Sequence, residues 1–277
     1  MLRNRIFSVY CLTALAGSAL SASSLSAYLS PPGQTSSIVA GVKTETFNNP
    51  GLLAGVMTYN SAIGVYSAVS PNAYGQTVTR IPVVTADAYG GADGSDYMYA
   101  GKRKNGDATA VDLLLSQASN YFGFWWSAGD ATNVISIYDD GQFVAQFTTG
   151  DITTLLQNPS GQVVALNGDT YSSSSYYGNP TTEFPGQDSS EPFGYVSLVA
   201  AGFSFNEIVF SNIGGSGFET DNNSVYSGSV NIPQNYSSFV EVSDPPFVVH
   251  APEPATAGLA GVMIAAGLLA GRKKIRG

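Results

Sequence analysis

The chain contains 277 residues, of which 44% are hydrophobic and only 11% charged, and its formal net charge is −9. A negative surface repels phosphate backbones, so the charge gives no support to nucleic-acid binding. A chain with a single cysteine cannot form a framework of disulfide bonds within itself. With a single histidine, the chain is also poorly equipped for a Ser-His-Asp triad or a histidine-ligated zinc site.

Residues 1 to 27 have the pattern of a secretory signal peptide. Arg3 and Arg5 begin it, residues 6 to 19 are mostly apolar, and the small-residue stretch SALSASSLSA offers cleavage points between about Ala22 and Ala27. Cys11 lies in the apolar part and would leave with it. We therefore predict export, cleavage by a signal peptidase, and a mature body over residues 28 to 250 without a thiol.

The body has the composition of a β-rich exported protein. Five basic and 19 acidic side chains remain in it, a formal net charge of −14. Its aromatic and β-branched residues can build a core, and about 220 residues suit one large sandwich or barrel. We predict an all-β fold, an antiparallel sandwich or jelly roll, with strands in residues 37–47, 64–70, 76–84, 121–129, 195–200, 203–212 and 224–232.

Two segments look helical instead. The first is TAVDLLLSQAS at residues 109–119, and the second is GDITTLLQNPSG at residues 150–161, with Asp151 as its expected N-cap. We expect each to form no more than a short connecting helix.

Residues 133 to 148 predict a hairpin. Asp140 and Gly141 are turn residues that tolerate positive φ, and apolar and polar residues alternate on both sides of them. We expect one core face made of Ile135, Ile137, Phe143 and Phe147.

Trp125 and Trp126 are neighbours on a predicted strand, so their rings point to opposite faces. We expect Phe122, Phe124 and Trp126 to line the core and a neighbouring loop to cover Trp125. The alternative is an exposed Trp125 that stacks on a sugar ring of a polysaccharide.

Carboxylates gather in two places that would suit calcium, an ion that prefers six to eight oxygen ligands. The Gly-rich stretch DAYGGADGSD contains Asp87, Asp93 and Asp96. By analogy with carbohydrate-binding jelly rolls, a structural calcium would lie between Glu45 and the pair Glu219 and Asp221. Solvated surface acids are the alternative interpretation, and neither stretch has EF-hand spacing.

The C-terminus combines three features. Pro252, Glu253 and Pro254 form an extended joint, residues 255–271 carry no charge, and basic residues follow at once. As a helix this run would span roughly 25 Å, the lower limit for crossing a membrane, with the basic end in the cytoplasm. His250 is interpreted as a linker residue before the joint.

This arrangement resembles the PEP-CTERM proteins of Gram-negative bacteria. The matching residues are Pro252, Glu253, Pro254, the apolar run, and Arg272, Lys273 and Lys274. The resemblance implies transient anchoring in the inner membrane, cleavage at the motif by an exosortase, and delivery to the cell surface or the extracellular matrix of a biofilm. It covers about a tenth of the chain.

The body also resembles a subset of exosortase-dependent surface proteins. The similar stretches are residues 121–126, residues 133–141 and FETDN at residues 218–222. This resemblance implies a sandwich-like body and brings no active-site residues.

From sequence we therefore expect a non-enzymatic surface or matrix protein with a structural or interaction role. A carbohydrate-binding module for extracellular polysaccharide is the alternative. A glycoside-active enzyme that uses two carboxyl groups is the third interpretation.

Overall fold

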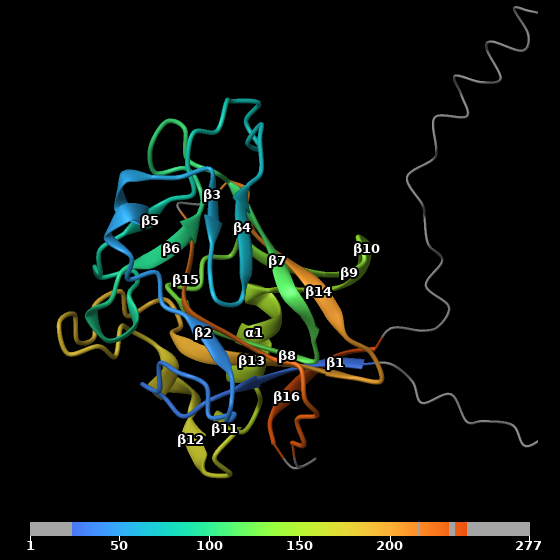
Figure 1. Ribbon diagram of the computed structural model, residues 1–277. Helices are drawn as coiled ribbons and strands as arrows, with labels where there is room; N and C mark the ends of the chain where they lie inside the picture. The colour runs from blue at the N-terminus through green and yellow to red at the C-terminus, as the bar shows by residue number, and fades with distance from the viewer. Residues whose placement is uncertain (1–23, 215–216, 233–235, 243–277) are drawn as a thin grey trace, which may run out of the picture.

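The computed structural model describes residues 24–214, 217–232 and 236–242, and these form a two-layer antiparallel β-sandwich (Figure 1). The predicted fold class is confirmed. The sorting motif, the apolar run after it, His250 and nearly all of the predicted signal peptide lie outside the described residues.

The first layer is an eight-stranded sheet in the order β16-β1-β13-β8-β15-β6-β5, with β2 also paired to β15. Every pairing in it is antiparallel. The strands are β1 (Ser24–Leu29), β2 (Lys43–Glu45), β5 (Val83–Val84), β6 (Tyr97–Ala100), β8 (Tyr121–Ser127), β13 (Gly194–Ala201), β15 (Phe218–Tyr226) and β16 (Ser238–Val242).

The second layer is a six-stranded sheet in the order β10-β9-β14-β7-β4-β3, also antiparallel. Its strands are β3 (Thr58–Asn60), β4 (Gly64–Ala68), β7 (Ala110–Ser119), β9 (Asn133–Asp139), β10 (Gln142–Thr148) and β14 (Phe205–Asn212). A small pair, β11 (Gln162–Val164) and β12 (Thr170–Ser172), and the 3-10 turns η1 (Pro50–Ala54), η2 (Ala92–Gly94) and η3 (Ser173–Tyr176) lie in the connections.

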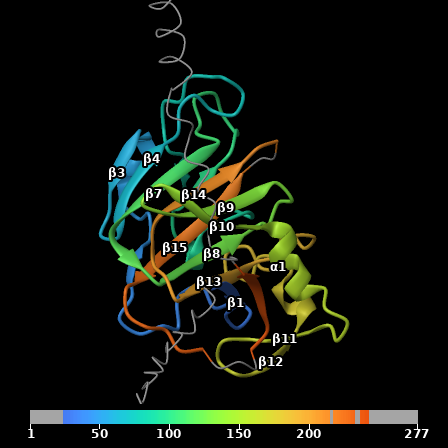
Figure 2. The same cartoon turned by 90° about the vertical axis from the view of Figure 1, so that its right-hand side faces the viewer.

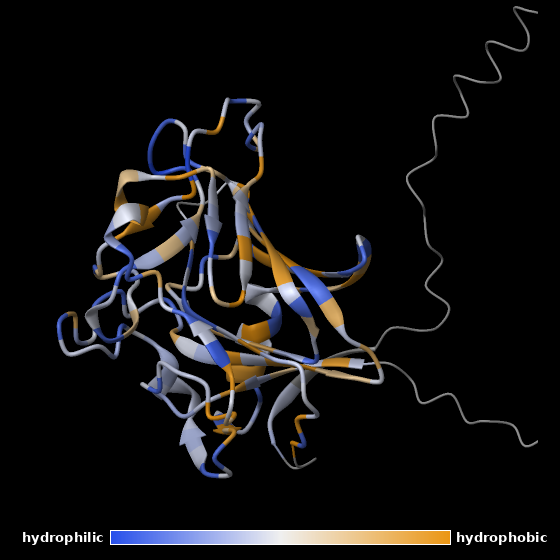
Figure 3. Ribbon diagram, viewed as in Figure 1, coloured by the Kyte–Doolittle hydropathy of each residue, from blue (hydrophilic) through white to orange (hydrophobic). Residues whose placement is uncertain are grey.

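The core lies between the two sheets and is rich in phenylalanine. Phe122 and Phe124 of β8 meet Phe210 of β14 at ring-centroid distances of 5.9 and 6.2 Å, and Phe218 of β15 lies 5.5 Å from Phe210. Figure 3 shows apolar segments in β7 and β14, and buried residues alternate with more exposed ones along most of both strands, as expected for strands with one face toward the core.

The predicted helix at residues 150–161 is confirmed as α1 (Thr149–Leu156), but its N-cap is Thr148 rather than Asp151. Asp151 is the third helical residue and completes a capping box with Thr148, each side chain accepting from the other's backbone N–H. The helix contacts the edge strands β10 and β16 and buries Ile152, Leu155 and Leu156, so it closes the sandwich along that edge.

The prediction of a helix at residues 109–119 is wrong, because this segment forms β7. Val111, Leu113 and Leu115 are buried with a period of two, and β4 and β14 flank the strand on its two sides. Pairing with two strands outweighs the helical propensity of the leucine-rich sequence.

The hairpin of β9 and β10 is confirmed, with positive φ at Asp140 (47°) and Gly141 (74°). Ile135, Ile137 and Phe147 share the expected core face. Phe143 does not, because a β-bulge between Phe143 and Ala145 turns its side chain outward, where it is 50% exposed.

Several predicted strands are shorter than expected, and several strands, among them β1, β3, β6 and β16, lie where none was predicted. Only Lys43–Glu45 of residues 37–47 and Val83–Val84 of residues 76–84 are strand. Strand β1, in contrast, begins at Ser24 inside the segment assigned to the signal peptide and lies between β13 and β16.

Candidate functional site

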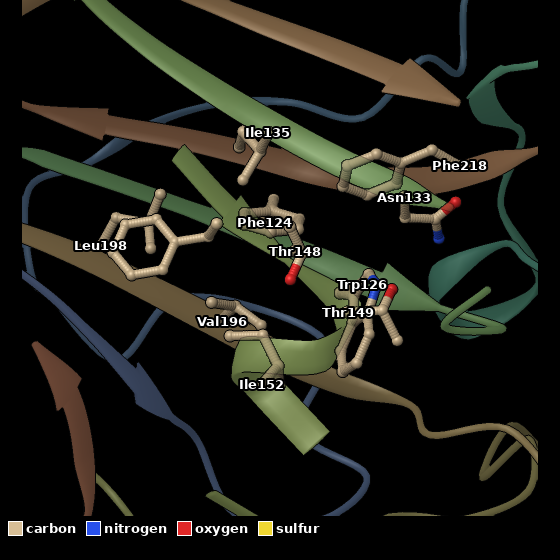
Figure 4. Close-up of a pocket in the computed structure, with 11 residues that line it drawn as sticks. Phe124, Trp126, Asn133, Ile135, Thr148, Thr149, Ile152, Val196, Leu198 and Phe218 are labelled. Carbon is tan, nitrogen blue, oxygen red and sulfur yellow. The ribbon is translucent and has the colours of Figure 1, made fainter. Parts of the chain in front are cut away.

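A small cavity lies inside the sandwich. The space between β8, β13 and α1, lined by Trp126, Ile152 and Val196 among others, has a volume of about 10 Å³ (Figure 4). That volume holds about one water molecule. This cavity is therefore too small for an organic ligand.

Trp125 lies on the outer face of the eight-stranded sheet and is only 1% exposed. Its ring packs against Phe193 at 6.4 Å, and Ala92, Ala128 and Tyr195 complete a small separate cluster. The expectation that a neighbouring loop covers Trp125 is confirmed. In this conformation the ring cannot stack on a sugar.

Asp221 lies beside this cluster and is fully buried. Its Oδ2 accepts from the backbone N–H of Ala92 (2.9 Å) and from the Ser95 hydroxyl (2.5 Å), and its Oδ1 accepts from the Asn222 N–H (2.7 Å). Burial raises the pKa of Asp221 to about 7, although these donors oppose the rise. The carboxyl group ties the loop over Trp125 to β15.

Glu219, two residues earlier on β15, forms an ion pair with Arg103. The guanidinium also donates to the Tyr97 hydroxyl (2.8 Å), lies 4.3 Å from the centre of the Tyr99 ring, and is 3.7 Å from Asp87. Burial raises the pKa of Glu219 to about 7, and Arg103 limits the rise. Glu219 is therefore held by a cation from this chain.

Glu45 is buried, and its oxygens accept from the Phe47 N–H and from the Tyr59 hydroxyl of the other sheet. The structure thus gives Glu45, Glu219 and Asp221 separate protein partners. Among residues 24–214, 217–232 and 236–242 no group of three or more metal-ligating side chains is found, and the calcium prediction gains no support.

The Gly-rich stretch is likewise engaged with the protein. Asp87 accepts from the Tyr97 hydroxyl (2.9 Å), Asp93 accepts from the Thr35 hydroxyl (2.6 Å), and the Asp96 N–H donates to Asn48. These contacts fix the loop that covers Trp125.

The outer face of the six-stranded sheet carries several partly exposed side chains. We call it the open face. One row of residues in strand register crosses it from β10 to β4, and the row consists of Phe143, Tyr138, Glu207, Leu114 and Val65. The next row consists of Gln146, Ser136, Val209, Asp112 and Ser67.

The open face is partly apolar and negatively charged. Phe143 and Leu114 are half exposed, and the Phe143 ring packs edge-on against Tyr138 at 5.8 Å. With strands about 4.8 Å apart, five strands give a surface roughly 19 Å wide. Figure 2 shows β7, β14, β9 and β10 side by side.

Asp112 and Glu207 lie diagonally across the neighbouring strands β7 and β14. The Asp112 Oδ1 is buried and accepts no hydrogen bond from any described residue. Burial, and secondarily the charge of Glu207, raise the pKa of Asp112 to about 6. The sequences of the six strands contain no lysine or arginine, so no cation within this sheet balances the pair.

Sequence reasoning missed this site for two reasons. Asp112 was assigned to a helix, although the alternation of Val111, Leu113 and Leu115 carried the strand signal. The alternating pattern places Phe143 in the core. The β-bulge that turns it outward shifts the register, and no characteristic residue in the sequence marks the position of that bulge.

No family model, curated protein or solved structure matches the chain. Within the described part of the chain, no helix is long and apolar enough to cross a membrane.

Proposed function

We propose that this chain is an exported protein of the bacterial cell surface or extracellular matrix, sorted by an exosortase, whose β-sandwich has a structural or interaction role. The observation that carries the proposal is the order of Pro252, Glu253, Pro254, an uncharged run and a basic cluster at the C-terminus. The pattern at residues 1 to 23 supports the same route of export.

The fold is compatible with such a route. Ser24, where β1 begins, pairs with Val242, where β16 ends, so the chain enters and leaves the sandwich at one corner. A segment before β1 and a segment after β16 can therefore both reach one membrane while the body lies on one side of it. This adjacency supports the proposal.

The test is mass spectrometry of the protein recovered from the cells that export it. We expect no peptide from residues 255–274 on surface-located protein, because cleavage at the motif removes them. Pro252→Ala with Pro254→Ala should leave the tail attached, whereas Pro245→Ala with Pro246→Ala, two prolines outside the motif, should not. An intact tail on surface-located wild-type protein would refute exosortase sorting.

Carbohydrate binding is the second candidate, and the open face is the observation that favours it. A glycoside-active enzyme is the third, because Asp112 and Glu207 are two carboxyl groups on neighbouring strands. Release of reducing ends from a polysaccharide, lost in Asp112→Asn, would favour the enzyme over a binding module.

A further inference from the structure

We propose that the open face binds a polysaccharide that carries hydrogen-bond donors but no acid groups, with sugar rings on Tyr138 and Phe143 and donors directed to Glu207. This inference rests on the proposed function, since it assigns the ligand class of the exported body.

The aromatic pair supplies the first part of the argument. Tyr138 and Phe143 are opposite each other on β9 and β10, and their rings make an edge-on contact on the outside of the sheet. The face of an aromatic ring is electron-rich and attracts the weakly positive C–H groups of a sugar ring. Leu114, exposed two strands away in the same row, extends the apolar strip.

The carboxyl pair supplies the second part. Glu207 lies between Tyr138 and Leu114 in the row, and Asp112 lies diagonally next to it. The Asp112 Oδ1 is enclosed by the protein, so a ligand on the open face meets the Glu207 carboxylate rather than this oxygen. A sugar hydroxyl or ammonium group would donate to the Glu207 carboxylate in a charge-assisted hydrogen bond.

Charge selects among polysaccharides. The six strands carry acidic side chains and neither lysine nor arginine. A uronate or sulfate group would meet two carboxylates on this surface and be repelled. The same surface accepts a neutral glycan through its hydroxyl groups or an amino-glycan through its ammonium groups.

Two other parts of the surface are less suited to this ligand. Trp125 is covered, and Glu219 and Asp221 already have donors from this chain. A surface hollow of about 700 Å³ beside α1 is lined mainly by small polar residues such as Thr154, Asn158 and Ser160 and by no aromatic ring.

The experiment measures retention of the purified full chain, in a detergent without a sugar headgroup, on three insoluble polymers: a neutral β-glucan, a glucosamine polymer and a polyuronate. We expect retention on at least one of the first two and none on the polyuronate. Retention on the glucan that is insensitive to salt would identify hydroxyl donors. Retention on the glucosamine polymer that falls with salt would identify ammonium donors.

The variants locate the site. Tyr138→Ala with Phe143→Ala should weaken binding at least about tenfold, and Glu207→Gln about three- to tenfold. Matched controls are Tyr74→Ala and Glu183→Gln, an exposed tyrosine and an exposed acid outside the six strands, which should leave binding unchanged. All of these side chains are at least partly exposed, and a melting curve identifies any variant that is unfolded.

Absence of retention on both acid-free polymers, equal retention of the double variant and wild type, or preferential retention on the polyuronate would each overturn the inference. The assay uses purified protein and requires no processing. A protein that binds none of the polymers would therefore not contradict sorting by an exosortase. Likewise, a C-terminus that stays uncleaved in cells would not contradict binding by the open face.

Discussion

The buried carboxylates show that individual acids in this protein have different roles. Asp221 and Glu219 are sealed under a loop and hold it through Ser95, Ala92 and Arg103. Asp112 and Glu207 lie on the open face without a cation in the same sheet. Two of these acids therefore fix a loop, whereas the other two lie on the outside of a sheet that has no basic residue in its strands.

The first prediction concerns Asp221 and pH. Its pKa in the folded state is about 7, against an ordinary value of 3.8, so between about pH 4 and pH 7 the folded state binds more protons than the unfolded chain. The free energy of unfolding should therefore fall as pH rises through that window, by up to about 1.4 kcal/mol per pH unit for this group, and level off above it.

Denaturant unfolding at several pH values measures this slope. Asp221→Asn removes the titrating group, so its unfolding free energy should change less between pH 4 and 7 than that of the wild type, even though the variant is less stable overall. Asp169→Asn, a control at an exposed acid, should keep the wild-type slope. An Asp221→Asn slope equal to the wild-type slope would contradict the assignment.

At the scale of elements, the β9–β10 hairpin shows how one strand serves two surfaces. Ile135 and Ile137 enter the core, while Ser136 and Tyr138 belong to the open face. The turn is held by two hydrogen bonds between Asp140 and Asn206 of β14. The hairpin therefore positions half of the candidate site.

The second prediction tests this hairpin. Ile137→Asp buries an unpaired carboxylate and should cost several kcal/mol of folding free energy, enough to unfold a marginal domain. Ser136→Asp places the same charge on the outer face and should cost less than about 1 kcal/mol. Equal losses in thermal melts would show that the two positions do not lie on opposite faces.

Asp140→Ala provides the third prediction. Alanine at a φ of 47° is more strained than aspartate, and the substitution also removes the acceptor for the Asn206 amide. We expect a loss of about 1–2 kcal/mol in denaturant unfolding. Asp140→Gly suits the positive φ and loses only the side-chain bond, so a Gly variant less stable than the Ala variant would contradict the turn geometry.

The fourth prediction concerns the start of the mature chain. Leu25 and Ala27 of β1 are buried, and β1 joins β16 to β13. Cleavage after Ala27 would remove four of the six residues of this strand. We therefore expect mass spectrometry to find the mature N-terminus at or before Ser24, and a folded exported protein that begins at Tyr28 would contradict this.

Much of the fold follows from local pattern, but the site does not. Alternation and turn residues identify the hairpin, β8, β13 and β14, because these signals lie within a few residues of one another. Arg103 and Glu219 are 116 residues apart in sequence, and nothing near either residue indicates the pairing. The bulge at Phe143 and the loop over Trp125 depend on tertiary packing for the same reason.

At the scale of the whole molecule, the two faces of the sandwich differ. Loops cover the eight-stranded sheet around Trp125, whereas the six-stranded sheet presents its open face. Residues 28 to 250 have a formal net charge of −14. The acidic side chains repel one another, and any dissolved salt weakens this repulsion by screening. Salt should therefore stabilise the fold without a specific cation site.

The last prediction separates screening from calcium binding. Glu45, Glu219 and Asp221 each accept hydrogen bonds from this chain, and calcium would have to displace those donors. We therefore expect CaCl₂ and NaCl at equal ionic strength to raise the melting temperature equally. Binding at 100 times the dissociation constant would instead add about 2.7 kcal/mol, or roughly 5–10 °C in a domain of this size. A calcium-specific rise of that order, abolished in Glu219→Gln or Asp221→Asn but kept in Asp169→Asn, would show that these carboxylates exchange their protein partners for the ion.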